Sequence, residues 1–517
     1  MLVLITLICL RFILLAEIER ESSEIGLLKA IGLPNKTLKW LYLQKIVLIA
    51  SVGSLIGYPL AILFLPITTK RIRETFGETS LSLSNGVLGF VIAFLLFCFV
   101  CFYSSKVLNR IKKASVVELL VQENGFSKLR KKKHSLPPVH HLSANGLVTR
   151  RKLKNSYAFP FWLCLLVSFA IFLPYRLIST MNDSEFITYM GSRPYDISVE
   201  VVEGRAIESR AKTAKQILQT FAKPHSFSYD EIKRTSLQAI SSEGKVISLP
   251  TDIGKNTGTK LHYLKGSSAK TDREISLSLL AADELGKNVG DTLTFTVNGQ
   301  SYSLKIVGLY QDITNGGKTA KMTRNLPQAN AQKYIFYLHL ANSKQKKATL
   351  RALSSAFSKT GYRISDAQGF IQQTLGGVIQ QLQKTFYAML SVCLLVFSGI
   401  LFFFLTLHIN RHQKEIIFKR TLGIPFSSIY LQELYPLLIS SLLGAFSGII
   451  AVQYLGKFLI SILLQLINSG IQQISFIEMN WIELVNFLCI IFMNLAIITY
   501  LTLIPAKKTS LLAYKND

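Results

Sequence analysis

The residue types that could do chemistry are few in this sequence, and they do not gather into a recognisable site. The segment Asn315–Thr319, NGGKT, ends like a phosphate-binding loop, but that motif needs a glycine at position 312, where Asp312 stands. The eight histidines form no spaced ligand set with acids or cysteines. The sequence therefore predicts a flexible loop at 315–319. It indicates no catalytic, cofactor-binding or metal site, and we do not expect an enzyme.

The six cysteines all lie in long apolar runs, where cysteine behaves as a small apolar residue. They are Cys9, Cys98, Cys101, Cys164, Cys393 and Cys489. None falls between residues 174 and 385, so that segment has no disulfide framework and no cysteine-based metal site. An exported domain without disulfides is compatible with a bacterial protein.

Membrane helices are the elements that must carry the function. The 517 residues are 49% hydrophobic, and the apolar residues cluster in runs near the roughly 20 residues that span a bilayer as a helix. We expect seven spans, at about Met1–Ala16, Leu43–Pro66, Val87–Ser105, Tyr157–Leu173, Phe386–His408, Tyr430–Leu455 and Ile482–Leu503.

Charged residues within these spans are limited to Arg11, Lys45, Glu433 and Glu483. The last three lie near span ends, where we expect them to reach the interface. Because proton and ion relays use buried ionisable groups, this distribution disfavours a secondary transporter.

The net charge of +28 is explained better by membrane topology than by nucleic-acid binding. Lys106–Lys154 is densely basic, with LRKKKH at Leu129–His134 and TRRKLK at Thr149–Lys154. Lys and Arg collect in cytoplasmic loops, and basic runs bind anionic lipid head groups. We therefore place 106–156 and the C-terminus inside a bacterial plasma membrane and about 174–385 outside it, and we expect no nucleic-acid partner.

One stretch of the chain occurs twice, at a fixed offset of 391 residues (415 − 24). Residues 20–57 and 411–448 align without a gap, and each runs from a charged helix through a Gly-x-Pro break into a long apolar helix. The alignment places Glu24, Lys29, Gly32, Pro34, Gly53 and Gly57 on Glu415, Arg420, Gly423, Pro425, Gly444 and Gly448. Related halves of this kind are typical of transporters built from duplicated units.

Each charged elbow is too polar to cross the bilayer and should lie at the membrane face. Proline removes a backbone donor and restricts the residue before it, so Gly32–Pro34 and Gly423–Pro425 should break the helix. A simple interfacial turn would explain one copy. Two copies with the same acid, base and break favour a shared protein contact.

The apolar helix after each elbow contains two glycines four residues apart. Small residues at this spacing let two helices approach closely in lipid. Gly53 with Gly57, and Gly444 with Gly448, therefore predict a symmetric helix-packing seam, either within the chain or with a second subunit.

Residues 174–385 are expected to form one α+β extracytoplasmic domain, inserted between spans four and five of an α-helical transmembrane bundle. Strands are expected at Tyr195–Val202 and Lys333–Leu340, and helices at Arg205–Ala222 and Gln368–Thr385. Asn298-Gly299 joins two alternating segments, which is the strongest short hairpin signal. The helix at Gln368–Thr385 runs into the next span as a stalk.

Three motifs together resemble a known family. EIGLLKAIG-x-P at Glu24–Pro34, followed by an apolar helix with GxxxG, resembles the signature of the FtsX-like (MacB-type) ABC transporter permeases. Leu280–Tyr310 looks like the small β-rich subdomain of the outer domain in that family. Ala144–Leu147 with Arg150–Lys152 is similar to the family's N-terminal elbow helix.

The resemblance implies a division of the chain into five parts. Residues 1–123 form a partial permease repeat with three spans and the first elbow, and 124–156 a basic cytoplasmic linker and elbow helix. A span at 157–173 leads to the extracytoplasmic domain with its stalk at 174–385, and 386–517 form the second repeat. A family half has one span, an outer domain and three spans, so we expect a chain cut within a longer gene or complemented by an upstream protein.

The resemblance also implies a function without catalysis in this chain. A separate cytoplasmic ATPase would dock on the elbows, and the permease would convert ATP hydrolysis into movement of the outer domain, exporting or extracting an amphiphile or antimicrobial peptide. The alternative is a mechanotransmission or signalling protein that regulates a cell-wall hydrolase or a sensor kinase without transport. Expected partners are that ATPase, membrane lipids, and a second permease copy or an upstream half-permease.

Overall fold

The computed structural model of the chain describes two compact units. The described residues are 21–76, 83–109, 158–241, 244–327, 329–358, 361–411, 413–467, 470–478 and 480–508, with 7, 10, 11, 13–15, 17 and 18. Met1–Tyr175, Gln381–Gln453 and Glu478–Asp517 make up what we call the helical unit, and Arg176–Gln380 with Tyr454–Ile477 the sheet unit. Most of the first expected span, and the linker at 124–156, lie outside the described residues.

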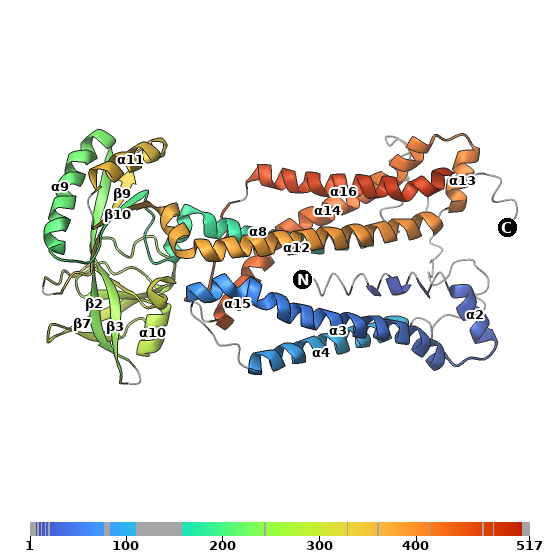
Figure 1. Cartoon of the computed structure of the whole chain (residues 1–517), viewed down its shortest axis with the longest axis horizontal. Coiled ribbons are helices and arrows are strands. Elements are labelled where there is room, and N and C mark those ends of the chain that lie inside the picture. Colours follow the sequence, from blue (N-terminus) through green and yellow to red (C-terminus); the bar gives the residue numbers. More distant parts are fainter. Residues whose placement is uncertain are drawn as a thin grey trace. The chain divides into compact units, whose positions relative to one another are not determined.

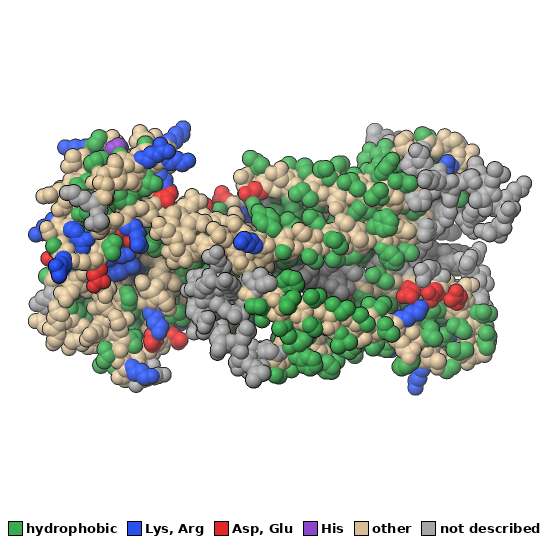
Figure 2. Space-filling view, in the orientation of Figure 1, with side chains coloured by type: hydrophobic (Ala, Val, Ile, Leu, Met, Phe, Trp, Pro, Cys, Tyr) green, Lys and Arg blue, Asp and Glu red, His purple; other side chains and the backbone are tan. Residues whose placement is uncertain are grey.

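The helical unit contains long apolar helices and two short ones (Figure 1). These are α2 (Ser22–Ala30), α3 (Asn35–Phe76), α4 (Leu83–Leu108), α8 (Ala158–Asn182), α12 (Ala367–Arg411), α13 (Gln413–Thr421), α14 (Phe426–Ala451) and α16 (Trp481–Lys508). Among the described residues, six helices are long and apolar enough to cross a membrane, and they coincide with the six expected spans after the first. On the face shown in Figure 2, hydrophobic side chains gather over the helical unit, as contact with lipid requires.

The span predicted at Tyr430–Leu455 ends too early. A π-helical turn, Val452–Gly456, follows α14, and α15 (Lys457–Ile467) continues the helix. The physical reason is that residues 458–467 are mostly apolar and that no proline ends the helix before Ile467. The sheet unit contains Tyr454–Ile477 in addition to Arg176–Gln380, which lies within the domain expected at 174–385.

The sheet unit is built on one mixed ten-stranded sheet with the order β10-β1-β9-β2-β3-β8-β5-β7-β4, in which β6 pairs with β2 and β7. The strands are β1 (Ile197–Val201), β2 (Phe227–Ile240), β3 (Val246–Ile253), β4 (Tyr263–Gly266), β5 (Glu274–Ser278), β6 (Thr292–Val297), β7 (Gln300–Tyr310), β8 (Ala320–Met322), β9 (Lys333–Leu340) and β10 (Tyr362–Asp366). Helices α9 (Ile207–His225) and α11 (Lys346–Ala356) enclose one hydrophobic core, and α10 (Leu279–Leu285) belongs to a second.

Most secondary structure expected in this unit is confirmed. Strand β9 has the predicted bounds, β1 lies within Tyr195–Val202, and Val297 pairs with Gln300 across the Asn298-Gly299 turn. Helix α12 contains the predicted stalk and continues as one helix to Arg411. The prediction of a flexible loop at 315–319 is wrong. Thr314–Gly317 form a 3-10 turn, and Thr319 donates a hydrogen bond to Asp312 in a buried polar cluster.

Candidate coupling sites

The two elbows have the same local structure, residue for residue. Helix α13 occupies the bounds of α2 shifted by 391, and α14 begins 391 residues after α3. In each copy a four-residue connection separates the short helix from the long one, Ile31–Pro34 in the first and Leu422–Pro425 in the second. The internal repeat seen in the sequence is therefore also a structural repeat.

A glycine in a left-handed conformation ends each short helix. Gly32 has a φ of +94° and Gly423 a φ of +81°, and glycine reaches this region without the steric cost that a Cβ brings. The proline then starts the long helix. The carbonyl of Pro34 accepts hydrogen bonds from the amides of Thr37 and Leu38, and the carbonyl of Pro425 accepts them from the amides at the equivalent positions. Glycine and proline thus determine where one helix stops and the next begins.

The inner side of each elbow is closed by three aliphatic residues. Ile18, Ile25 and Leu38 are buried in the first copy, and Ile409, Ile416 and Ile429 are buried at the equivalent positions of the second. Each trio takes one residue from the helix before the elbow, one from the elbow helix and one from the helix after it. Burial of this trio packs each elbow helix onto the two helices that flank it.

Polar contacts also join the helices before and after each elbow. In the first copy, Tyr42 Oη donates to Glu21 Oε2 at 2.7 Å, and Lys45 Nζ lies 3.5 Å from Glu17 Oε1. In the second copy, His408 Nε2 lies 3.5 Å from Glu433 Oε2. His408 is the counterpart of Glu17, and Glu433 is the counterpart of Tyr42. The acid therefore lies before the elbow in the first copy and after it in the second.

Glu433 is buried inside the helical unit. Its side chain is only 3% exposed, and that of His408 is 7% exposed. The pairing partner lies on a different helix of the fold, which is why sequence spacing alone did not indicate the burial.

The charged residues predicted for docking lie on the elbow helices, with different exposures. Glu24 is exposed in the first turn of α2, and partial burial lowers the pKa of Lys29. Glu415 Oε1 lies 2.8 Å from Lys419 Nζ on the same helix, and Arg420 is half-buried. These side chains are available only in part for contact with another protein.

An apolar pair on the outer side of each elbow was missed by sequence reasoning. Leu27 and Ile31 are 57% and 70% exposed, and their counterparts Phe418 and Leu422 are 63% and 65% exposed. Each pair is spaced four residues apart, which places its members on one helix face. The repeat could have revealed this pair, because both copies have apolar residues at these equivalent positions. Apolar residues that stay exposed in both copies indicate a contact surface.

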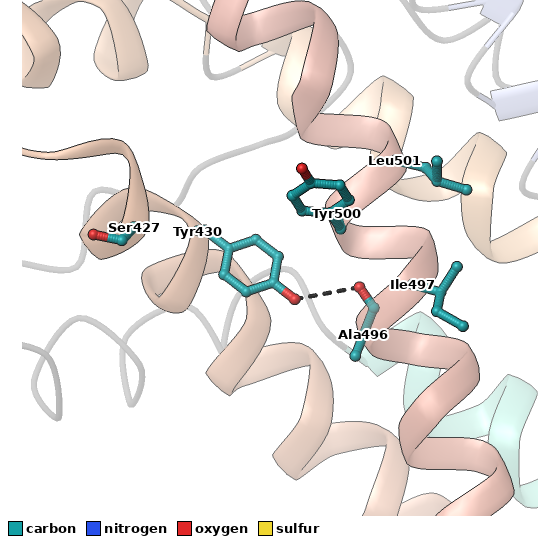
Figure 3. Close-up of a pocket in the computed structure, with 6 residues that line it drawn as sticks. All are labelled: Ser427, Tyr430, Ala496, Ile497, Tyr500 and Leu501. Carbon is teal, nitrogen blue, oxygen red and sulfur yellow. Dashed lines mark hydrogen bonds between the residues drawn. The ribbon is translucent and has the colours of Figure 1, made fainter.

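An open cavity of about 510 Å³ lies beside the second elbow. Ser427 and Tyr430 of α14 line it together with Ala496, Tyr500 and Leu501 of α16 (Figure 3). Tyr430 Oη donates to the carbonyl of Ala496 at 3.2 Å. The lining is mainly apolar, and the tyrosine hydroxyl holds the two helices together on one side of the cavity.

The glycine pairs behave differently in the two copies. Gly444 and Gly448 are buried, and the backbone of α8 approaches both of them closely. Gly53 and Gly57 are exposed, and no described atom lies within 4 Å of a Cβ built on either residue. Among the described residues, a close helix approach at the glycine pair therefore occurs in the second repeat and not in the first.

In the sheet unit, the segment Gly470–Ile477, which follows α15, is held by hydrogen bonds to its backbone. Gln311 Oε1 accepts from the amides of Gln472 at 2.6 Å and Gln473 at 2.8 Å, and its Nε2 donates to the carbonyl of Gln473 at 3.0 Å. The amide of Asp312 donates to the carbonyl of Gly470 at 3.3 Å. We call this the 470–477 segment.

Residues from other parts of the unit hold the second half of the 470–477 segment. Tyr189 Oη accepts from the amide of Ser475 at 2.8 Å and stacks on His262 with ring centroids 4.0 Å apart. Arg176 donates to the carbonyl of Ile477 and lies over the ring of Phe476. The segment is thus fixed at several points along its length.

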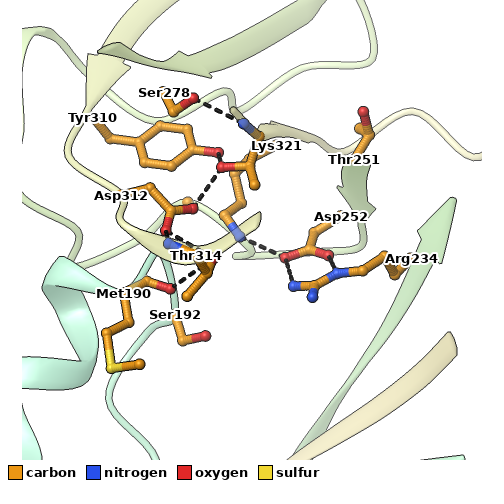
Figure 4. Close-up of polar contacts among 12 residues, drawn as sticks. Met190, Ser192, Arg234, Thr251, Asp252, Ser278, Tyr310, Asp312, Thr314 and Lys321 are labelled. Atoms are coloured by element: carbon orange, nitrogen blue, oxygen red, sulfur yellow. Dashed lines mark hydrogen bonds and ion pairs between the residues drawn. The ribbon is translucent and has the colours of Figure 1, made fainter. Parts of the chain in front are cut away.

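A buried polar cluster lies next to this segment (Figure 4). Asp312 accepts hydrogen bonds from Thr314 and Thr319, and burial raises the pKa of its carboxyl group. Burial alone would also raise the pKa of Asp252, but Arg234 and Lys321 outweigh it and hold that pKa well below its usual range. The described residues contain no group of three or more metal-ligating side chains.

These features define the class of protein. The described chain is a multi-pass helical membrane protein with an α+β domain inserted in the sequence between α8 and α12. Residues 1–113, which include the first elbow, match the family model "FtsX-like permease C-terminal". This match confirms the resemblance seen in the elbow motif, and residues 1–113 are similar to the C-terminal domain of FtsX-like permeases.

Two solved structures are similar over part of the chain. The extracellular domain of the noncanonic ABC-type transporter YknZ from Gram-positive bacteria is 14% identical, covering 33% of this chain and all of that chain, with a TM-score of 0.23. A domain from Porphyromonas gingivalis described as belonging to a permease protein is 12% identical, covering 33% of this chain and 86% of that chain, with a TM-score of 0.22. No curated protein matches the sequence.

Proposed function

We propose that this chain is the permease subunit of a bacterial ABC transporter of the MacB type, and that a separate cytoplasmic ATPase docks on its two elbows. The observation that carries the proposal is the residue-by-residue equivalence of the elbows. Two like surfaces on one chain suit a partner that presents two like faces. ATP hydrolysis is assigned to the partner, and the elbows of this chain receive the resulting movement.

Each elbow offers the partner an apolar anchor with a charged rim. Burying an exposed leucine, isoleucine or phenylalanine stabilises a contact by about 1.5–3 kcal/mol. The exposed pairs Leu27–Ile31 and Phe418–Leu422 would therefore supply most of the docking energy. Glu24, Glu415 and the basic residues Lys29 and Arg420 would supply polar rim contacts, which favour orientation more than affinity.

In this proposal the elbows and the C-terminus lie inside the plasma membrane and the sheet unit lies outside it. Helix α12, unbroken from Ala367 to Arg411, is the stalk that carries the motion. Gln372 Nε2 donates to Asn182 Oδ1 at 2.8 Å, which ties the stalk to the end of α8. The substrate class would be an amphiphile or an antimicrobial peptide.

One observation favours the second candidate function, mechanotransmission without transport. The 470–477 segment leads along the chain into α16 and is held by the sheet unit through backbone hydrogen bonds. Such a connection suits a protein whose main output is a change in the sheet unit that a cell-wall hydrolase or a sensor kinase detects.

The test is to purify the chain together with an ABC ATPase of its source cell and to measure stimulation of ATP hydrolysis in reconstituted membranes. We expect Ile31→Glu with Leu422→Glu to reduce the stimulation at least about tenfold, because loss of two apolar anchors exceeds the roughly 1.4 kcal/mol that a factor of ten represents. Glu24→Lys with Glu415→Lys should also abolish stimulation while leaving membrane insertion intact.

Ser23→Glu is the matched control, because Ser23 is an exposed polar residue of α2. It adds a charge to the same helix without removing an apolar contact. Stimulation that persists in both double variants would refute the docking role of the elbows. A loss of membrane insertion would instead assign Ile31 and Leu422 to lipid anchoring.

A further inference from the structure

The glycine-containing face of α3 is exposed, whereas the same face of α14 is buried. The difference holds at four positions that are spaced four residues apart. Ser440, Gly444, Gly448 and Val452 are buried, whereas their counterparts Ile49, Gly53, Gly57 and Ala61 are exposed. These positions recur every four residues, so in each repeat they form one stripe along one face of the helix. The stripe is covered in the second repeat, whereas in the first repeat no described residue covers it.

Contact with lipid does not account for this difference. Helix α3 also has positions that are exposed in both repeats, and these identify the side that faces lipid. Leu48, Val52 and Leu55 are exposed, as are their counterparts Ile439, Leu443 and Phe446. The glycine stripe is a separate side of the helix. The repeats also disagree at Lys45, Ser54 and Leu65, whose counterparts Pro436, Ala445 and Gly456 are buried, and these positions continue the stripe or adjoin it.

The covering of α14 shows what kind of surface fits these glycines. A Cβ on Gly444 would lie 2.2 Å from the carbonyl oxygen of Phe161, and one on Gly448 would lie 2.4 Å from that of Leu165. The backbone of α8 therefore lies directly on the glycines, an approach that permits Cα–H···O contacts and that any larger residue would prevent.

The direction of α8 follows from the same contacts. Gly444 contacts Phe161 and Gly448 contacts Leu165, so residue numbers rise together along the two helices. The helices are parallel, and α8 enters the pair from the end of α14 that adjoins the elbow. Helix α8 is already engaged in this way and cannot also cover α3 of the same chain.

We propose that the Ile49–Ala61 stripe of α3 seats a transmembrane helix of a second polypeptide, parallel to α3 and entering from the elbow side. The partner helix is apolar and presents its backbone to Gly53 and Gly57, as α8 does to Gly444 and Gly448. Pairing of α3 with α3 of a second copy is disfavoured, because in the covered repeat the glycines meet a helix with large residues and not another pair of glycines.

The experiment uses the full chain in membranes of its source cell, with a photo-cross-linking amino acid at position 49, at position 61 or, as a control, at position 52. We expect positions 49 and 61 to attach to one apolar segment of another polypeptide, with the site from 61 about three helical turns further toward its C-terminus. Position 52 should attach to lipid only.

Dependence on the glycines completes the test. Gly53→Leu with Gly57→Leu should reduce the yield of both adducts at least about tenfold, since an overlap that costs 1.4 kcal/mol has this effect. Val52→Phe adds bulk on the lipid side and should leave the yield unchanged. An adduct between two copies of this chain, lipid adducts alone at 49 and 61, or attachment sites in the reverse order would each overturn the proposal.

Discussion

Replacing Gln311 by methionine tests whether a single side chain holds the 470–477 segment. Gln311 is 2% exposed, and its amide group makes three hydrogen bonds to backbone groups of Gln472 and Gln473. Methionine keeps the length of the side chain but leaves two amides and one carbonyl of the segment without this partner. Each hydrogen bond contributes about 0.5–1.5 kcal/mol net, so the loss of three should destabilise the segment by roughly 2 kcal/mol.

Hydrogen exchange of the full chain in detergent measures this effect directly. A loss of about 2 kcal/mol should accelerate exchange at the amides of Gln472 and Gln473 roughly thirtyfold. Amides of the β6–β7 hairpin should keep their rates. Gln300→Met is the matched control, because the side chain of Gln300 is exposed on β7. Unchanged rates at 472 and 473, or faster exchange throughout the sheet unit, would refute the local role of Gln311.

Two further predictions concern the elbows and the buried charges. Gly32→Ala and Gly423→Ala should each lower the free energy of unfolding by about 1–2 kcal/mol, because both glycines have a left-handed backbone conformation. Thermal unfolding in detergent measures this change. Gly399→Ala inside α12 is the control and should be neutral or stabilising. Because the pKa of Asp252 is depressed on folding, its stabilising contribution should be complete above the unfolded value of about 3.9 and decline as the pH falls below it. The stability difference between the native chain and Asp252→Asn should accordingly shrink in acid; a difference that grows in acid would contradict this assignment.

Local sequence signals predicted the elements whose structure is decided locally. The Gly-x-Pro break fixed both elbows, because left-handed glycine and the restrictions of proline act within a few residues. Asn298 and Gly299 predicted their hairpin for the same reason, and both have positive φ in the structure. Apolar run length was sufficient to find six spans, since a bilayer imposes a nearly constant helix length.

Contacts between distant parts of the chain were not predictable in this way. Gln311 reaches backbone groups 161 and 162 residues away, and Tyr189 one 286 residues away. Backbone groups carry no sequence pattern, so nothing in residues 470–477 indicated these contacts. Thr319 was assigned to a flexible loop for a related reason, because its partner Asp312 has no recognisable motif around it.

The acid of the polar contact lies before the first elbow but after the second. This difference limits which segments of the two repeats can be exchanged. Grafting the start of α14 in place of the start of α3 would put a glutamate at position 42, near Glu17 and Glu21, and so gather three carboxylates. The opposite graft would leave His408 facing a tyrosine. The duplicated segments are therefore interchangeable only when the helices on both sides of an elbow are transferred together.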